Sequence, residues 1–179
     1  MPSIAFDNWF AAYLGQQPFQ VQRLLRNGMA TRFLIAWSLF ESKCFEGFVK
    51  IDRLSIFAKK VSEEKSFARG EFEEAGRHFH DRYQNRDRLR HLLHGQKVNG
   101  LTEILGKQFE DLADDELLFM LLVVVYRFRN NIFHGNKGVD TWLQYRTQIE
   151  MCTNIMQYLI SFGEATHNKG MQAAAYGGA

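Results

Sequence analysis

Proline, cysteine and net charge are all scarce in this 179-residue chain, and each scarcity excludes a class of protein. The two prolines are Pro2 and Pro18, so nothing later forbids long helices, and the lack of proline-rich turns argues against an all-β fold. The two cysteines, Cys44 and Cys152, lie in apolar helical patterns, which favours buried, reduced thiols over a disulfide framework. Because the formal net charge is only +2, nucleic-acid binding would require a local basic patch.

Apolar runs of membrane-spanning length are absent as well. The longest run, Leu117–Tyr126, has ten residues, whereas a transmembrane helix needs about 18. The first residues lack a basic segment followed by an apolar core, so we expect no signal peptide. These features predict a cytoplasmic protein that has no membrane partner.

Apolar and aromatic residues are plentiful, at 46% and 14% of the chain, which is enough for one globular core. Apolar residues recur at three- and four-residue steps, which predicts helices, and no segment shows the alternation of a half-buried strand. Four of these helical patterns are long, at 29–50, 67–94, 115–134 and 140–163. The second is expected to break near Asn85. Shorter helices are expected at 3–13, 19–27, 52–60 and 99–112.

The third long pattern has the best-defined ends. The carboxylates of Asp114, Asp115 and Glu116 suit the N-terminus of a helix, where they can cap free N–H groups. Gly135 suits a left-handed cap directly after His134. The first three turns are apolar nearly all round, so we expect this helix to be central and covered by the others.

The predicted fold class is therefore all-α, an up-and-down helical bundle with four long helices plus additional short helices. We divide the chain into an N-terminal helical extension at 1–28, the bundle at 29–163 and a flexible C-terminal tail at 164–179. In the first long helix, the expected apolar face comprises Phe33, Ala36, Leu39, Phe40, Cys44 and Phe48.

The segment "YRFRNNIFHGNK" ends the apolar run in a group of cationic and amide side chains. A helical wheel places four of them on one stripe: Arg127, Asn130, Asn131 and His134. Arg129 lies well off that stripe. The segment is either a solvated helix end, which cations and asparagine favour, or a functional site. Interleaved apolar residues predict partial burial, and buried polar groups need partners.

"RNNIFH", Arg129 to His134, resembles the Arg-four-residues-His motif of the HEPN superfamily, with Asn130 as the polar residue that follows the arginine. "RFLIAWSLFESKCF", Arg32 to Phe45, and "RFRNNIFHGNK" also resemble a plasmid- and prophage-borne bacterial branch of that superfamily. The family's spacing equally admits Arg127, and the wheel favours it, whereas the Arg-Asn pair favours Arg129. We prefer Arg129 and keep Arg127 as a second cation of the site.

The resemblance covers the four long patterns and implies a HEPN-like bundle that acts as a metal-independent endoribonuclease without a cofactor. In such enzymes the 2′-hydroxyl of RNA attacks the neighbouring phosphate and leaves a cyclic phosphate. His134 would be the general acid or base, Arg129 would stabilise the phosphorane, and Asn130 would orient the ring or contact the phosphate. The supporting residues would be Arg127, Asn131 and Glu41. Glu41 either holds one of the arginines or is simply an exposed glutamate.

The resemblance also implies a bacterial toxin or phage-defence effector whose substrate is RNA, with tRNA as one candidate. Two motifs would face one groove in a C2 homodimer, and a protein antitoxin or regulator is a candidate partner. The alternative function is a non-catalytic HEPN-fold module that binds nucleotides or RNA, or that dimerises. A third hypothesis is a structural bundle whose helix end is merely polar.

Segment 77–97 is the most basic part of the chain, with six basic residues against two aspartates and a local charge of +4. Its RNA-binding candidates are Arg77, Arg82, Arg86, Arg88 and Arg90, with Tyr83 stacking on bases. Lys137 is a further candidate outside the segment. The alternative is a solvated helix face with pairs four residues apart, such as Arg77–Asp81. The four histidines here lack a cysteine or carboxylate set, so we predict no metal site.

Overall fold

The computed structural model describes residues 5–15, 17–26, 28–133 and 145–176. Within these ranges all regular secondary structure is helical, which confirms the predicted all-α class. The elements, in chain order, are α1 (Phe6–Leu14), α2 (Pro18–Leu25), α3 (Gly28–Cys44), the 3₁₀ turn η1 (Ile51–Arg53), α4 (Leu54–Ser62), α5 (Gly70–Tyr83), α6 (Arg86–Leu93), α7 (Leu101–Leu105), the 3₁₀ turn η2 (Phe109–Asp111), α8 (Asp114–Phe133) and α9 (Arg146–Tyr176). No described helix is both long and apolar enough to cross a bilayer.

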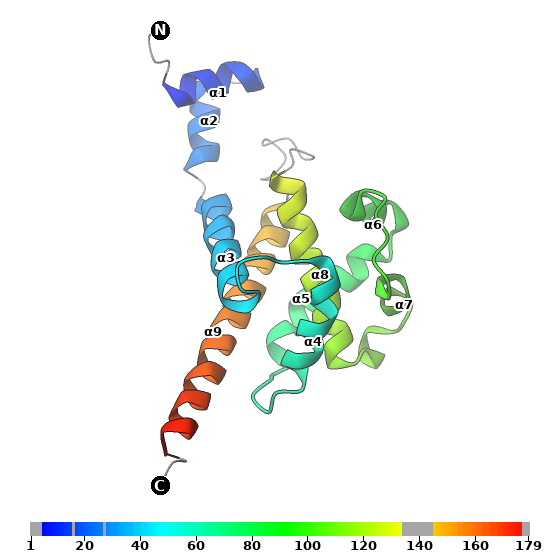
Figure 1. Ribbon diagram of the computed structural model, residues 1–179. Coiled ribbons are helices and arrows are strands. Elements are labelled where there is room, and N and C mark those ends of the chain that lie inside the picture. The colour runs from blue at the N-terminus through cyan, green and yellow to red at the C-terminus, as the bar shows by residue number, and fades with distance from the viewer. Residues whose placement is uncertain (1–4, 16, 27, 134–144, 177–179) are drawn as a thin grey trace.

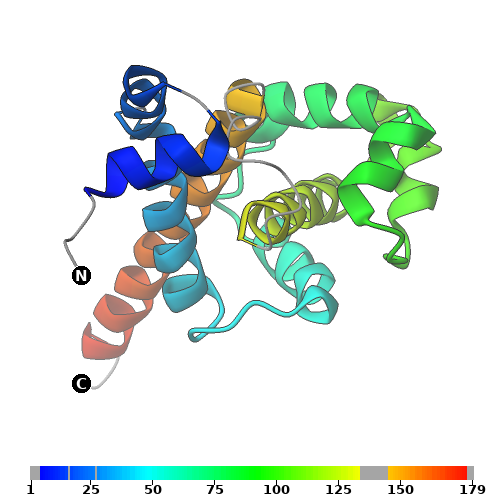
Figure 2. The same ribbon diagram turned by 90° about the horizontal axis from the view of Figure 1, so that it is seen from above.

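Helix α8 occupies the centre of the molecule. Nearly every residue from Leu117 to Val125 is buried, and α4, α5, α6, α7 and α9 all pack against this helix. Figure 2 looks along α8 and shows the other helices arranged around it. The predicted central position of this segment is confirmed, because a helix that is apolar on all sides must be covered on all sides.

Side chains at its N-terminus determine where α8 begins. Oε2 of Glu116 accepts a hydrogen bond from the backbone N–H of Ala113 at 3.2 Å, so Glu116 has the capping role predicted for this acidic cluster. Lys107 donates to the same carboxylate at 2.6 Å. Arg69, directly before α5, donates to Asp114 at 2.7 Å and to the carbonyl of Leu112 at 2.9 Å. These contacts attach the start of α8 to the start of α5.

Helices α3 and α9 pack side by side against this centre (Figure 1). Phe33, Ala36 and Phe40 are buried as expected, but Leu39 and Phe48 are 45% and 68% exposed, which corrects the predicted apolar face. Met29 and Trp37 are also buried on this helix. Helix α3 ends at Cys44, before the predicted end near residue 50, because Glu46 and Gly47 adopt positive φ angles of 55° and 96°.

Two other predicted helix boundaries have different outcomes. The break near Asn85 is confirmed, since its side-chain oxygen accepts hydrogen bonds from the backbone N–H groups of Asp87 and Arg88 at 3.1 and 3.0 Å and caps α6. The predicted end of the last helix near Gly163 is wrong, because α9 continues to Tyr176. The added stretch has no proline and contains several alanines, which favour helix.

The first two helices carry a small core of their own. Phe10, Ala11 and Val21 are buried together, separately from the main core. On the outside of α1, Trp9 stacks on Tyr13 with ring centroids 5.7 Å apart, and the two side chains are 49% and 74% exposed. In Figure 1 this pair of helices lies beyond the N-terminal end of α3.

Gly76 marks the closest approach of α5 to α8. A Cβ atom added there would lie 2.6 Å from Cδ1 of Leu117 and 3.0 Å from Cε2 of Phe109, and both neighbours are in the core. We therefore expect Gly76→Ala to lower the free energy of unfolding by about 1–3 kcal/mol through overpacking. Urea denaturation measures the change. The matched control is Gly163→Ala in α9, where a Cβ atom added to the glycine would meet no neighbour within 4 Å. The free energy of unfolding of this variant should rise by up to about 1 kcal/mol, because alanine favours helix. A Gly76→Ala protein as stable as that control would contradict the tight contact.

Candidate functional site

The guanidinium of Arg127, near the end of α8, caps the C-terminus of α6. Its Nε and Nη2 donate to the carbonyl oxygens of Leu92 and Leu93 at 3.2 and 2.5 Å, and its Nη1 donates to Oε1 of Gln96 at 2.6 Å. The last carbonyls of a helix have no partner within it, and the dipole favours a cation there. Arg127 is 4% exposed, and burial lowers the pKa of its guanidinium.

Asn131 lies one turn after Arg127 and faces the same helix end. Its Nδ2 donates to the carbonyl of Leu92 at 3.3 Å, and the residue is 1% exposed. Its buried Oδ1 makes no hydrogen bond within the described part of the chain. Arg127 and Asn131 therefore join α6 to α8. These contacts account for both side chains by packing, and the supporting roles expected of Arg127 and Asn131 in the site stay predictions.

Arg129 and Asn130 face away from α6. Nη1 of Arg129 donates to Oδ1 of Asn130 at 3.1 Å, and the guanidinium carbon lies 5.4 Å from the ring centroid of Trp37 on α3. Both polar residues are half-buried, whereas Trp37 is only 3% exposed. The aromatic face attracts the cation and fixes its direction. Among the described members of the predicted stripe, Asn130 therefore has different partners from Arg127 and Asn131.

Glu41, one turn after Trp37 on α3, does not hold either arginine. Its Oε1 accepts a hydrogen bond from the backbone N–H of Val49 at 3.3 Å, which closes the turn after α3. Within the described ranges no ion pair connects Glu41 with Arg127 or Arg129, so the expected supporting role is corrected. The last predicted members of the site, His134 and Lys137, lie outside the described residues, and their roles stay predictions.

The basic segment splits into residues that belong to the fold and residues that face solvent. Arg77 donates to Glu110 at 2.6 Å and to Glu73 at 3.1 Å, and it lies 4.5 Å from the ring centroid of Phe109. Its two carboxylate partners raise its pKa and neutralise its charge. Tyr83 is 4% exposed and stacks on Phe79, so it is a core residue. The burial of Tyr83 argues against its stacking on RNA bases, and RNA contact by Arg77 stays a prediction.

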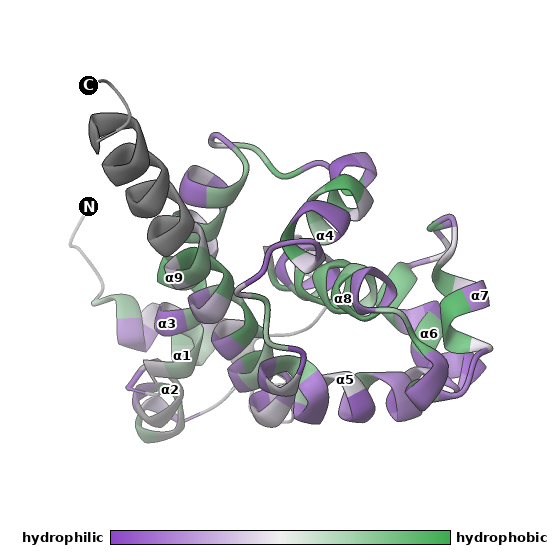
Figure 3. Ribbon diagram, turned by 90° about the horizontal axis from the view of Figure 1, so that it is seen from below, coloured by the Kyte–Doolittle hydropathy of each residue, from purple (hydrophilic) through white to green (hydrophobic). Residues whose placement is uncertain are grey.

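The remaining arginines of the segment are accessible. Arg86, Arg88 and Arg90 are exposed on α6, where Arg90 pairs with Asp87 at 3.0 Å. Arg82 is half-buried on α5, with its guanidinium carbon 5.9 Å from the ring centroid of Tyr145. Figure 3 shows large hydrophilic areas on α5 and α6. A basic surface thus persists on these helices, although it is smaller than the sequence predicts.

A cleft of about 540 Å³ lies at the opposite end of α8. Asp52, Glu103, Asp115 and Phe119 are among its lining residues. Asp115 and Arg129 are 14 positions apart, which at about 1.5 Å per residue separates them by roughly 20 Å along α8. The cleft is therefore separate from the motif. Across the described residues, no three His, Cys, Asp or Glu side chains gather as metal ligands.

Compared with models of known protein families, with curated proteins and with solved structures, the chain gives no significant match. The resemblance to HEPN proteins therefore stays a prediction from the sequence.

Sequence reasoning missed two residues of this region. Trp37 contacts Arg129, and its one visible signal was an aromatic residue within the amphipathic pattern of α3. Gln96 receives a hydrogen bond from Arg127 across 31 positions of sequence, and nothing local indicated that pairing.

Replacing Arg127 with alanine should destabilise the fold. The variant removes the charge-assisted hydrogen bonds to the carbonyls of Leu92 and Leu93 and leaves a cavity in a buried place, so we expect the free energy of unfolding to fall by about 2–4 kcal/mol. Arg127→Lys should recover only part of this loss, because an ammonium lacks the planar fork. Chemical denaturation measures both variants. Arg88→Ala on the exposed face of α6 is the matched control, with an expected change within about 0.5 kcal/mol. Equal stability of the two alanine variants would rule out the capping role.

Proposed function

We propose that this protein is a metal-independent endoribonuclease of the HEPN type, with Arg129, Asn130 and His134 as its catalytic residues. The observation that carries the proposal is the pairing of Arg129 with Asn130, held beside Trp37 in the last turns of the buried central helix. The guanidinium of Arg127 is hydrogen-bonded to the end of α6, so we assign the arginine of the motif to Arg129. His134 follows Asn130 by four residues in the sequence.

In the proposed reaction the 2′-hydroxyl of RNA attacks the adjacent phosphate and the 5′-oxygen leaves. His134 moves a proton, since an imidazole titrates near neutral pH. Arg129 donates to the non-bridging oxygens of the phosphorane, where negative charge develops, and Asn130 contacts the phosphate or the histidine. Trp37 acts as a positioning residue because its ring restricts the guanidinium. The reaction needs no metal or cofactor.

A C2 homodimer with two motifs across one groove would supply both an acid and a base. Support comes from two exposed apolar side chains one turn apart on α3: Ile35 and Leu39 are 58% and 45% exposed. Exposed apolar groups of this kind mark interaction surfaces when they are contiguous. The exposed arginines Arg86 and Arg88 of α6 are proposed contacts for RNA phosphates.

We further propose the biological role that the motif implies, a cytoplasmic bacterial toxin or phage-defence effector that cuts RNA, with tRNA as a candidate substrate. A protein antitoxin or regulator would control it.

One observation favours a second function, a non-catalytic binding or dimerisation module. Arg127 and Asn131 hydrogen-bond to the end of α6, so part of the polar helix end has a structural explanation.

Cleavage of RNA in EDTA tests the proposal. The wild-type protein should release products with cyclic phosphate ends, and His134→Ala and Arg129→Ala should each lower the rate by about 10²–10⁴-fold, because a proton-transfer group or a phosphorane contact is lost. Gel analysis of a labelled RNA measures the rate.

The matched control is Arg53→Ala, an exposed arginine of η1 that should retain full activity. Circular dichroism confirms that each variant is folded. Unchanged cleavage by folded His134→Ala would disprove the catalytic assignment. A wild-type protein that binds RNA without cleaving it would favour the non-catalytic module.

A further inference from the structure

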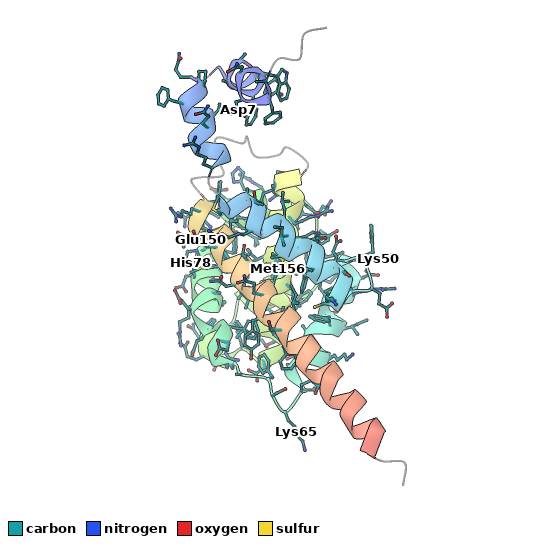
Figure 4. The ribbon with its side chains drawn as sticks, turned by 90° about the vertical axis from the view of Figure 1, so that its left-hand side faces the viewer. Asp7, Lys50, Lys65, His78, Glu150 and Met156 are labelled. Atoms are coloured by element: carbon teal, nitrogen blue, oxygen red, sulfur yellow. The ribbon has the colours of Figure 1, made fainter. Side chains whose placement is uncertain are left out.

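A second polar cluster joins α5 to the first turn of α9. Gln148 is buried at 8% exposure, and its Nε2 lies 3.1 Å from Nε2 of His78. His78 is half-buried, and its ring meets Phe79 edge to face at 5.2 Å. Figure 4 shows His78 beside the part of α9 that carries Glu150. The imidazole is therefore held on two sides, and the residue as a whole keeps part of its surface exposed.

The contact with Gln148 determines where the ring carries its proton. An amide N–H donates, so Nε2 of neutral His78 is the acceptor and Nδ1 holds the hydrogen. Burial lowers the pKa of His78, and the neighbouring cation of Arg82 lowers it further. Rotation of the Gln148 amide presents its oxygen to a protonated ring, so the same residue supports both charge states.

Arg82 lies one turn after His78 on α5 and forms no ion pair with any described residue. Its Nε is buried and makes no hydrogen bond, and within the described ranges no carboxylate lies at ion-pair distance from its guanidinium. The Tyr145 ring flanks it at 5.9 Å. Arg77 on the same helix is the opposite case, because two glutamates hold it. A half-buried guanidinium without a carboxylate can bind a ligand anion.

The other charged groups around this cluster are largely satisfied or exposed. Glu74 and Asp81 raise the pKa of His78 but by less than the opposing effects, and both lie at the surface, with the Asp81 side chain 81% exposed. On α9, Arg146 pairs with Glu150 at 2.9 Å. Arg82 is therefore the one half-buried charge here without an opposite charge among the described residues.

We propose that His78 and Arg82 form a phosphate-binding site that takes a phosphodiester of single-stranded RNA. The guanidinium fork matches the non-bridging oxygens, and Nδ1–H of His78 supplies a further donor. Tyr145 connects this place to the motif helix, since its ring lies 6.1 Å from Phe128, the residue before Arg129. The choice of RNA as ligand rests on the proposed function, whereas the phosphate site rests on the cluster itself.

A bound phosphate would favour the protonated ring of His78, so binding takes up a proton. Affinity should therefore increase as pH falls through the pKa of His78 in the complex, and it should level off below the lowered pKa of His78 in the free protein. Replacing His78 should remove this part of the pH dependence.

Fluorescence anisotropy with a labelled single-stranded oligonucleotide of 2′-O-methyl ribose tests the inference. This probe lacks the attacking hydroxyl, so binding is measured whether or not the protein cleaves RNA. Arg82→Gln should raise Kd about tenfold and lower the slope of log K against log salt by about one. Arg77→Gln on the same helix is the matched control and should change Kd less than about twofold, because Glu73 and Glu110 already neutralise that arginine.

The same measurement at pH 5.5 and pH 8 tests His78. The gain in affinity at low pH should be clearly smaller in His78→Gln than in the wild type. Should Arg82→Gln fail to fold, Arg82→Lys replaces it: the ammonium keeps the charge and loses the fork, so Kd should rise by about threefold or more.

Affinity independent of Arg82, an unchanged pH response in His78→Gln, or no binding by the wild type would overturn the inference. Cleavage of natural RNA is followed separately. Arg82-dependent binding without cleavage refutes the proposed function and leaves the phosphate site standing. Cleavage together with binding that is independent of Arg82 refutes the phosphate site and leaves the proposed function standing.

Discussion

The burial of α8 is the constraint on which the rest of this structure depends. Its apolar residues from Leu117 to Val125 are covered on all sides, so the other helices must surround it. The polar groups in its last turns are consequently brought into the protein and need partners there. Arg127 and Asn131 find them in the end of α6, whose terminal carbonyls need donors of their own. One set of hydrogen bonds thus satisfies two helix ends and fixes α6 against the centre of the fold.

This arrangement separates two arginines that are two positions apart. Arg127 is enclosed by carbonyl and amide oxygens, and its charge stabilises a helix terminus. Arg129 points towards α3, where the buried ring of Trp37 and the amide of Asn130 flank it. A phosphate needs a cation that is oriented but still accessible, and the half-buried Arg129 meets that requirement. Both residues have the same chemistry, so this difference in surroundings is what supports the proposed role of Arg129.

The same contrast occurs on α5. Arg77 is paired with glutamates from its own helix and from η2, while Arg82 has an aromatic ring and a histidine beside it and no carboxylate partner in the part of the chain that the structure describes. Carboxylate partners cancel a cation, whereas aromatic ones orient it and leave its charge available. The two half-buried arginines near the ends of α5 and α8, Arg82 and Arg129, are both flanked by an aromatic ring. Phe128 and Tyr145 connect the two places through the core.

Periodicity and composition in the sequence determined the all-α class, the central place of α8, the break capped by Asn85 and the short helices, because these depend on neighbours a few positions away. The sequence did not predict that α3 ends before Glu46 and Gly47, because hydrophobic periodicity does not reveal residues with positive φ angles. Only the tertiary structure decided what each polar side chain does. Arg127 meets Leu92 across 35 positions, Gln148 meets His78 across 70, and Glu41 turns to the backbone of Val49 and not to an arginine. Such pairings arise from how helices cross, and a helical wheel, which treats each helix alone, contains no information about the crossing.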